Sequence, residues 1–309
     1  MVRHYKPKDT SDKPLKTTFF TKNDIECPVC GNLFKREEMF TGRGRLVAGN
    51  VSEELRRIWM PGKWGLINPL LYPITVCPKC YFAVMSEDFL RIKAAKIEMA
   101  KSETERRQAT IKKLFGFLDF TMNRQIEHGA ASYLLAVQSY NYMDRYISPT
   151  IKKAICSLRS AWLFSDMENE YPDKEFGNVA LLFYRKALGF YHDALNRSSR
   201  AEESFDGVKS FGPDTDTNFG YDGVLYLIGY LTLKLGYLTS DIAKRKNDYE
   251  SAKRYISKMF GSGKYDKNKP SLLLDMTRDL YDELGEKIEE FESQMTVSSE
   301  PSNEQASKT

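Results

Sequence analysis

The spacing of apolar residues along the chain changes at about residue 86. Beyond that point they recur every three or four positions among charges of both signs, as in helices that bury one face. Ser86 is an expected N-cap, and Pro149 stands at the first position of a later helix, where proline is tolerated. The pattern predicts helices over residues 86–117 (one helix or two), 120–146, 149–167, 176–195, 221–238, 249–260 and 271–291.

Before residue 86 the apolar residues form short runs separated by glycine and proline. Residues 17–26 and 74–76 are predicted strands, each leading into a cysteine pair. Gly42 and Gly44 indicate the turn of a hairpin, and residues 51–59 are predicted to form a short helix. The small core expected for this part of the chain consists of Phe34, Phe40, Trp59, Trp64, Leu66, Leu70, Leu71 and Val76.

Part of the helical region resembles tetratricopeptide pairs, in which a small residue lies where two helices cross and a bulky residue follows a turn later. Ala180, Tyr184 and Ala187 have this spacing, and so do Ala187, Tyr191 and Ala194, so the register stays open. We expect the helices to pack as antiparallel, repeat-like pairs.

A better match to that repeat begins at residues 247–250 (NDYE), where a turn and an acidic start precede Ala252, Ile256 and Met259. The strict 34-residue period is absent, and residues 196–220, rich in serine, glycine and aspartate, are predicted to form an irregular insertion.

Four of the five cysteines form two C-x-x-C pairs, Cys27-Pro-Val-Cys30 and Cys77-Pro-Lys-Cys80. Each such turn brings two sulfurs to one side, and two turns supply the four ligands of tetrahedral Zn²⁺. The proline after each first cysteine restricts the backbone of the turn. The 46 residues between the pairs exceed the usual spacing, so this segment must fold back on itself. The sequence therefore predicts a zinc site at Cys27, Cys30, Cys77 and Cys80.

A site with four thiolate ligands leaves no open position for a substrate, so its expected role is structural. Gly31 follows the first pair, where a left-handed backbone is often needed, whereas Tyr81 stands at the equivalent position of the second. The expected fold is mainly α. A small α+β, zinc-ribbon-like module at residues 17–85 precedes an antiparallel, tetratricopeptide-like region at 86–294. A disordered N-terminal segment (1–16) precedes the module, and a disordered tail (295–309) follows the helices.

Several segments carry a family resemblance: CPVCG at residues 27–31 with Phe34, NPLLY at 68–72, CPKCYFA at 77–83 with EDF at 87–89, and two stretches at 248–257 and 269–279. Together they resemble the bacterial DUF2225 family, over residues 25–290 and most specifically at 68–80. The resemblance implies a bacterial protein with a two-C-x-x-C segment before tetratricopeptide-like helices, and it assigns no activity. Tyr81, where the family usually has glycine, is the clearest departure.

Composition and charge narrow the compartment and the partners. The net charge of +4, from 46 basic and 42 acidic residues, is too small to indicate nucleic-acid binding by itself. Residues 1–16 are polar and no apolar run follows them, so a secretory signal is not predicted. The longest apolar run, residues 224–233, is too short to span a membrane. Because C-x-x-C pairs fit a reducing compartment, we expect a cytoplasmic protein.

The remaining candidate residues have structural interpretations. His4 lies in the N-terminal segment 1–16, and His128 and His192 lie on predicted helices, far from the cysteines in sequence. Cys156 follows an apolar stripe and is expected to be buried. The turn at residues 42–45 (GRGR) could contact phosphate, although a hairpin tip is favoured. No P-loop, G-x-G-x-x-G or H-E-x-x-H motif is found.

Three functions stay open on this evidence. The favoured function is that of a non-enzymatic scaffold whose helical surface binds a protein partner. The second is nucleic-acid binding by the zinc module through Arg3, Lys6, Lys8, Lys13, Lys16, Lys35, Arg36, Arg43 and Arg45. The third is that of a thiol redox protein. If the N-terminal half has a functional surface, we expect it at residues 68–72 and not at the sulfurs.

Overall fold

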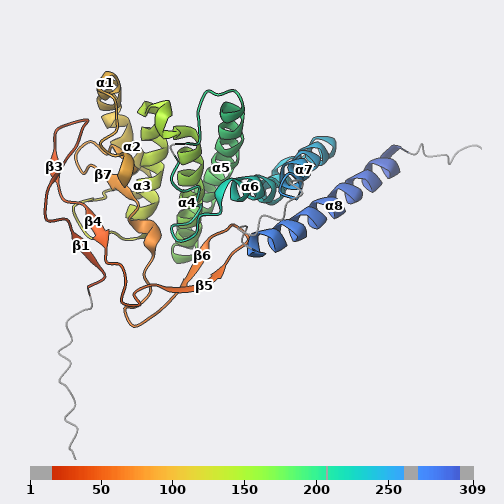
Figure 1. The fold of residues 1–309 in the computed structure, drawn as a ribbon, viewed down its shortest axis with the longest axis horizontal. Coiled ribbons are helices and arrows are strands. Elements are labelled where there is room, and N and C mark those ends of the chain that lie inside the picture. The colour runs from red at the N-terminus through yellow and green to blue at the C-terminus, as the bar shows by residue number, and fades with distance from the viewer. Residues whose placement is uncertain (1–15, 207, 261–270, 300–309) are drawn as a thin grey trace, which may run out of the picture.

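Short strands come first and helices follow in the computed structural model, which describes residues 16–206, 208–260 and 271–299 (Figure 1). The fold is mainly α, with small antiparallel strand pairs at its N-terminal end, as the sequence predicts. The strands are β1 (Thr18–Phe20), β2 (Ile25–Glu26), β3 (Leu33–Phe34), β4 (Glu37–Met39), β5 (Val47–Val51), β6 (Arg57–Met60), β7 (Ile74–Val76) and β8 (Ala83–Met85). The helices are α1 (Ala94–Ser102), α2 (Thr104–Phe115), α3 (Ile126–Ser139), α4 (Pro149–Glu170), α5 (Phe176–Ser199), α6 (Gly220–Leu235), α7 (Ile242–Ser257) and α8 (Ser271–Ser299).

The strand pairing differs from the sequence prediction in two places. The strands on either side of Gly42 and Gly44 do not pair with each other, because β4 pairs with β1 and β5 pairs with β6. The helix predicted at residues 51–59 is wrong, since this stretch forms the end of β5, a turn and most of β6. The strand predicted at residues 74–76 is confirmed as β7.

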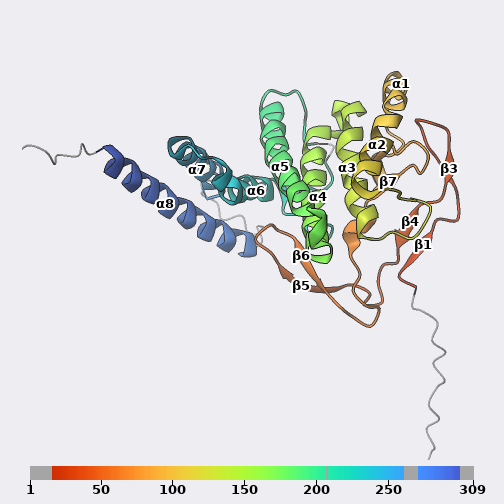
Figure 2. The ribbon, with the colours of Figure 1, turned by 180° about the vertical axis from the view of Figure 1, so that it is seen from behind.

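Successive helices from α3 to α8 pack against one another, with α3, α4 and α5 side by side (Figures 1 and 2). Pro149 is the first residue of α4, as predicted. Other helix starts differ from the prediction. The side chain of Ser86 bonds to the carbonyl of Pro73 instead of capping a helix, and α1 begins at Ala94. Asp241 caps α7, so residues 247–250 lie inside that helix and not in a turn.

Parts of the remaining expectations fall on residues that the structure does not describe. Residues 1–15 of the predicted N-terminal segment and residues 300–309 of the predicted tail lie outside the described residues. Helix α8 continues to Ser299, past the end predicted at residue 291 and into the segment predicted as a tail. The domain boundaries at 85 and 294 stay predictions.

One cluster of buried residues runs through the described chain from Cys27 to Phe291. Its N-terminal members include Phe34, Leu70 and Val76, as expected, whereas Leu66 is 65% exposed and does not belong to the core. The side chains of Phe40, Trp59, Trp64 and Leu71 are half-buried.

The two alternative tetratricopeptide registers on α5 are not distinguished by burial. Ala180, Tyr184, Ala187, Tyr191 and Ala194 are all buried, because they form one continuous stripe along the helix. The repeat itself stays a prediction.

A buried ion pair joins the start of the helical region to α4. Lys152 Nζ lies 2.6 Å from Asp88 Oδ2, and Tyr140 donates its hydroxyl to the same oxygen at 2.8 Å. Both charged side chains are at most 4% exposed, so Lys152 depends on Asp88 for compensation of its charge, whereas Asp88 has a second, more exposed partner in Arg91 at 3.3 Å. Tyr140 also accepts from the backbone N–H of Met85 at the end of β8. This contact fixes the position of β7 and β8 against the helices.

Candidate metal centre and the segment it encloses

The two C-x-x-C turns have the same backbone structure. In the first, the N–H of Gly31 donates to the carbonyl of Cys27 at 2.9 Å, and in the second Tyr81 donates to Cys77 at 3.0 Å. Each first cysteine in turn donates its N–H to the residue five positions later, at 2.9 Å in both turns. Strands β2 and β3 flank the first turn, and β7 and β8 flank the second. We call these units knuckle 1 (residues 25–34) and knuckle 2 (residues 74–85).

Tyr81 adopts the left-handed backbone that Gly31 adopts in knuckle 1, with φ values of 57° and 68°. A side chain other than glycine is strained in this conformation, so knuckle 2 forms the same turn as knuckle 1 at a cost in backbone strain. The Tyr81 hydroxyl donates to the carbonyl of Leu118 at 3.0 Å, and its ring meets Phe120 edge-on. These contacts offset the backbone strain and attach knuckle 2 to the loop before α3.

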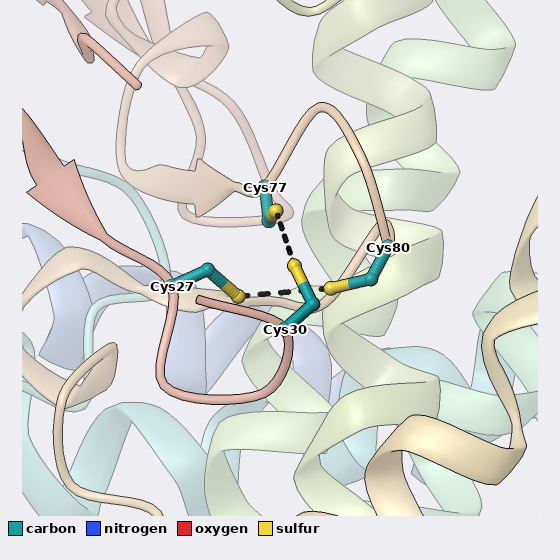
Figure 3. Close-up of side chains that lie close together, drawn as sticks. All are labelled: Cys27, Cys30, Cys77 and Cys80. Atoms are coloured by element: carbon teal, nitrogen blue, oxygen red, sulfur yellow. Dashed lines mark hydrogen bonds between the residues drawn. The ribbon is translucent and has the colours of Figure 1, made fainter. Parts of the chain in front are cut away.

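The structure brings all four predicted cysteines together (Figure 3). Their sulfurs lie within 4.8 Å of one another, and the two shortest separations, Cys27 to Cys80 and Cys30 to Cys77, are both 3.6 Å and both join one knuckle to the other. A disulfide would need about 2.05 Å, so these are four free thiols. Three are at most 2% exposed and Cys30 is half-buried. Such a group could hold a metal ion.

Hydrogen bonds divide the charge unequally among these thiols. The pKa of Cys77 lies well below its usual value, because the thiols of Cys27 and Cys80 and the N–H groups of Cys80 and Lys79 donate to its sulfur. The same thiol contacts, together with burial, raise the pKa of Cys27 and of Cys80. One thiolate is therefore stabilised within the cluster even before a cation is added.

Helix α2 supports knuckle 2 from behind. Arg107 is 1% exposed and donates to the carbonyl of Cys80 at 2.9 Å and to that of Ala100 at 2.7 Å. Gln108 donates to the carbonyl of Lys79 at 2.8 Å. The structure thus places a buried cation against the backbone of a thiolate site. The spacing of charges along α2 gave no sign of this role, since Arg107 stands among other basic residues.

The other candidate residues do not join the cysteine cluster. Cys156 is fully buried on α4, and burial raises the pKa of its thiol to about 12, so its prediction as a packing residue is confirmed. His128 accepts a bond from the N–H of Gln125 at 3.2 Å, and His192 packs edge-on against Tyr255. His4 lies outside the described residues.

The segment between the knuckles reaches across the molecule to the helical region. We call residues 43–66, which contain β5 and β6, the arm; it runs along the lower ends of the upright helices in Figures 1 and 2. At its turn, the carboxylate of Glu54 accepts from Trp162 Nε1 on α4, from Tyr184 OH at 2.8 Å on α5 and from Lys234 Nζ at 2.8 Å on α6.

Further contacts fix the rest of this turn. Leu55 is fully buried, with a φ of 57°, and its side chain lies close to Gly223 on α6. The guanidinium of Arg56 forms a bidentate pair with Asp166 at 2.9 and 2.5 Å. The face of α4–α6 that these contacts occupy is therefore already filled by the chain itself. These contacts could not be predicted from the sequence, because the residues of the arm lie more than a hundred positions from their partners on the helices.

Comparison with known proteins assigns the chain to a family. The family model described as "Uncharacterized protein conserved in bacteria (DUF2225)" matches residues 20–284. The chain belongs to this family. A relative in Borreliella burgdorferi, described as "Uncharacterized protein", is 39% identical over 267 residues, which are 86% of this chain and 95% of the relative. No solved structure matches the chain significantly. Among the described residues, no helix is both long enough and apolar enough to cross a membrane.

Proposed function

We propose that this DUF2225 protein is a non-enzymatic interaction scaffold whose N-terminal module is stabilised by one zinc ion. The observation that carries the proposal is the sulfur geometry. Zinc–sulfur bonds of about 2.3 Å at tetrahedral angles place sulfurs about 3.8 Å apart. The two 3.6 Å separations and the 4.8 Å limit for the whole group agree with that spacing.

Four thiolates around zinc would fill its coordination shell, which supports a structural role. Zinc binding would release the remaining thiol protons, and the cluster would then carry a net charge of −2. The buried guanidinium of Arg107, bonded to the Cys80 carbonyl, supplies part of the compensating positive charge. Knuckle 1 has only two residues in each strand, so its folding would depend on the metal.

Metal analysis combined with thiol titration tests this half of the proposal. We expect one zinc per chain and four thiols that react only after metal removal, and the Cys77→Ser variant should lose the metal. The matched control is Cys156→Ala, which changes a buried thiol outside the cluster and should keep full zinc content. Protein that contains no metal as isolated, and that has one acidic, reactive thiol, would instead support the redox alternative.

Removal of the metal should affect knuckle 1 and the arm differently. Residues 25–34 should lose protection in hydrogen exchange, whereas the arm should stay protected, since its turn is bonded to α4–α6 and not to the sulfurs. Most of the helical circular dichroism should remain. An unchanged near-UV aromatic signal in the metal-free protein would contradict a structural role for the metal.

The scaffold half of the proposal is supported by the open surfaces of the helical region. A groove of about 730 Å³ lies between the end of the arm and helices α6–α8, and its lining includes Tyr230, Tyr237, Arg245 and Phe291. Tyr237 is 65% exposed there. Aromatic and arginine side chains are enriched at protein-binding surfaces.

The nucleic-acid alternative is weakened by how its proposed residues are used. The guanidinium of Arg36 bonds to Glu38 and Thr75, and that of Arg45 is 9% exposed and stacks on Trp64 at 4.3 Å. Arginines that contact phosphate need free N–H groups at the surface.

We infer a reducing, cytoplasmic location from the four free thiols.

Affinity capture from the native cell tests the scaffold itself. Wild-type protein is compared with Cys77→Ser, which perturbs the module, and with Tyr237→Asp, which perturbs the groove. Partners lost with the first variant belong to the module, and those lost with the second belong to the helices. Capture of no protein above an untagged control would count against a scaffold.

A further inference from the structure

The arm has one face on the helices and one face without a partner. In β6 the side chains alternate, with Ile58 and Met60 exposed and Arg57 and Trp59 turned inward. Val47 pairs with Met60 across the hairpin and is 39% exposed, while Ile58 and Met60 are 45% and 49% exposed. Their shared face forms an aliphatic patch, which we call the arm face together with Leu66, 65% exposed.

A cleft of about 560 Å³ adjoins the arm face. Ile58 and Leu66 line it from the arm, and Leu71 and Tyr72 line it from the 68–72 segment. Ile126, at the start of α3, belongs to the same lining. The rest of the lining is polar and includes Asn68 and Gln125, and clefts of this size with apolar walls and a few polar groups are typical binding sites. The arm face therefore leads into a space that an incoming side chain can fill.

Among the described residues, the outer edge of β5 has no strand partner, whereas on β6 the N–H of Arg57 donates to Asp214 at 2.7 Å. Within the described chain, β5 and β6 pair only with each other. A two-stranded sheet with a free edge can accept a third strand, and main-chain hydrogen bonds then supplement the contacts of alternate side chains. This favours an extended polypeptide as the occupant of the arm face.

Charge complementarity specifies that polypeptide further. Residues 43–66 contain five basic residues and two acidic ones, and both acids, Glu53 and Glu54, are at the turn that docks on the helices. Apart from Glu53 at that turn, the exposed charged residues of the arm are the cations Arg43 and Lys63. In the adjoining cleft Asp166 is neutralised by its pair with an arginine, and Glu170 is the remaining carboxylate.

We propose that the arm face docks an acidic, extended segment of a partner protein, with one apolar side chain entering the 560 Å³ cleft. This inference rests on the proposed scaffold function and names its partner surface. Residues 1–15 of the same chain are excluded as the occupant, because four of them are lysine or arginine and only two are acidic. Single-stranded nucleic acid fits less well, since it needs exposed aromatic rings for stacking and the arm face is aliphatic.

Panning a display library of random 12-residue peptides on the zinc-loaded, full-length protein tests the inference. We expect the enriched peptides to carry net negative charge with apolar residues at alternate positions. Synthetic versions should bind at least tenfold more weakly to Ile58→Asp and Leu66→Asp, and more weakly to Lys63→Glu. The matched control is Leu90→Asp, which changes an equally exposed leucine (68%) outside the arm and should leave binding within twofold.

Other outcomes overturn the inference, and they separate it from the scaffold proposal. Peptides without acidic bias, or peptides insensitive to both aspartate variants, would show that the arm face is not their site. Peptides that lose binding with Tyr237→Asp instead would leave the scaffold function standing and refute its placement on the arm. A single-stranded DNA oligonucleotide whose binding depends on the arm residues would refute the choice of partner. Circular dichroism and zinc content confirm that each variant is folded.

Discussion

Removal of the Glu54 carboxylate is the most direct test of how the arm is held. Glu54→Ala eliminates the acceptor for three donors, of which Trp162 and Tyr184 are at most 7% exposed. Each donor left buried without a partner costs about 1–3 kcal/mol. The side chain of Lys234 is 34% exposed, so its lost ion pair adds no more than about 1 kcal/mol. We expect the arm to lose about 3–5 kcal/mol of docking free energy.

Hydrogen exchange of the amides in β5 and β6 measures this loss, because they exchange when the arm leaves the helices. A loss of 3–5 kcal/mol corresponds to about a hundredfold to a few thousandfold faster exchange. Glu54→Gln keeps an acceptor and should show a smaller effect. The control Glu53→Ala changes the neighbouring carboxylate, whose contact with Tyr230 is 3.4 Å long, and should change exchange less than fivefold. Exchange in Glu54→Ala that also changes less than fivefold would refute the reasoning.

Three further substitutions test other parts of the fold. Lys152→Met removes the buried cation beside Asp88 and leaves only the half-exposed Arg91, so it should lower the free energy of unfolding by about 3 kcal/mol in urea titrations. Adding Asp88→Asn should restore much of it, and a double variant no better than the single one would contradict this. Tyr81→Phe removes the bond to the Leu118 carbonyl and should cost about 1 kcal/mol, whereas no loss would mean that the bond contributes nothing. Burial, followed by the charge of a nearby arginine, lowers the pKa of His128, so the unfolded state binds this proton more tightly. Stability should therefore fall as the pH drops through about 6.5, by up to about 1.4 kcal/mol per pH unit, and His128→Gln should flatten that slope; an identical slope would exclude this histidine.

Features that depend on residues close in sequence were predictable. The two cysteine turns, the strand at residues 74–76 and the helix beginning at Pro149 each follow from local patterns, and the structure contains all of them. Local hydrogen bonding also explains why Tyr81 adopts the same turn as Gly31. The same two backbone bonds surround both first cysteines, and in both turns the residue after the pair adopts a left-handed backbone.

The helix predicted at residues 51–59 is absent, because the local sequence pattern does not determine the structure of this segment. Val51, Leu55, Ile58 and Trp59 have the spacing of one helical face, which the sequence could not distinguish from the true structure. Their conformation is decided by side chains on α4–α6, which hold the turn through Glu54. A tertiary contact thus overrides local propensity, and no pattern within the segment records it.

The equivalence of the two knuckles has a consequence for how this chain tolerates change in length. The excursion from Cys30 to Cys77 leaves and returns to sulfurs only 3.6 Å apart, so it begins and ends at nearly one point. The free energy of closing such a loop grows only logarithmically with its length. Insertions or deletions at exposed positions between the knuckles, away from the docked turn at Glu54 and from the buried Leu70, should therefore leave the four-thiol cluster intact. For protein engineering, the arm is a natural position at which to graft a new recognition element.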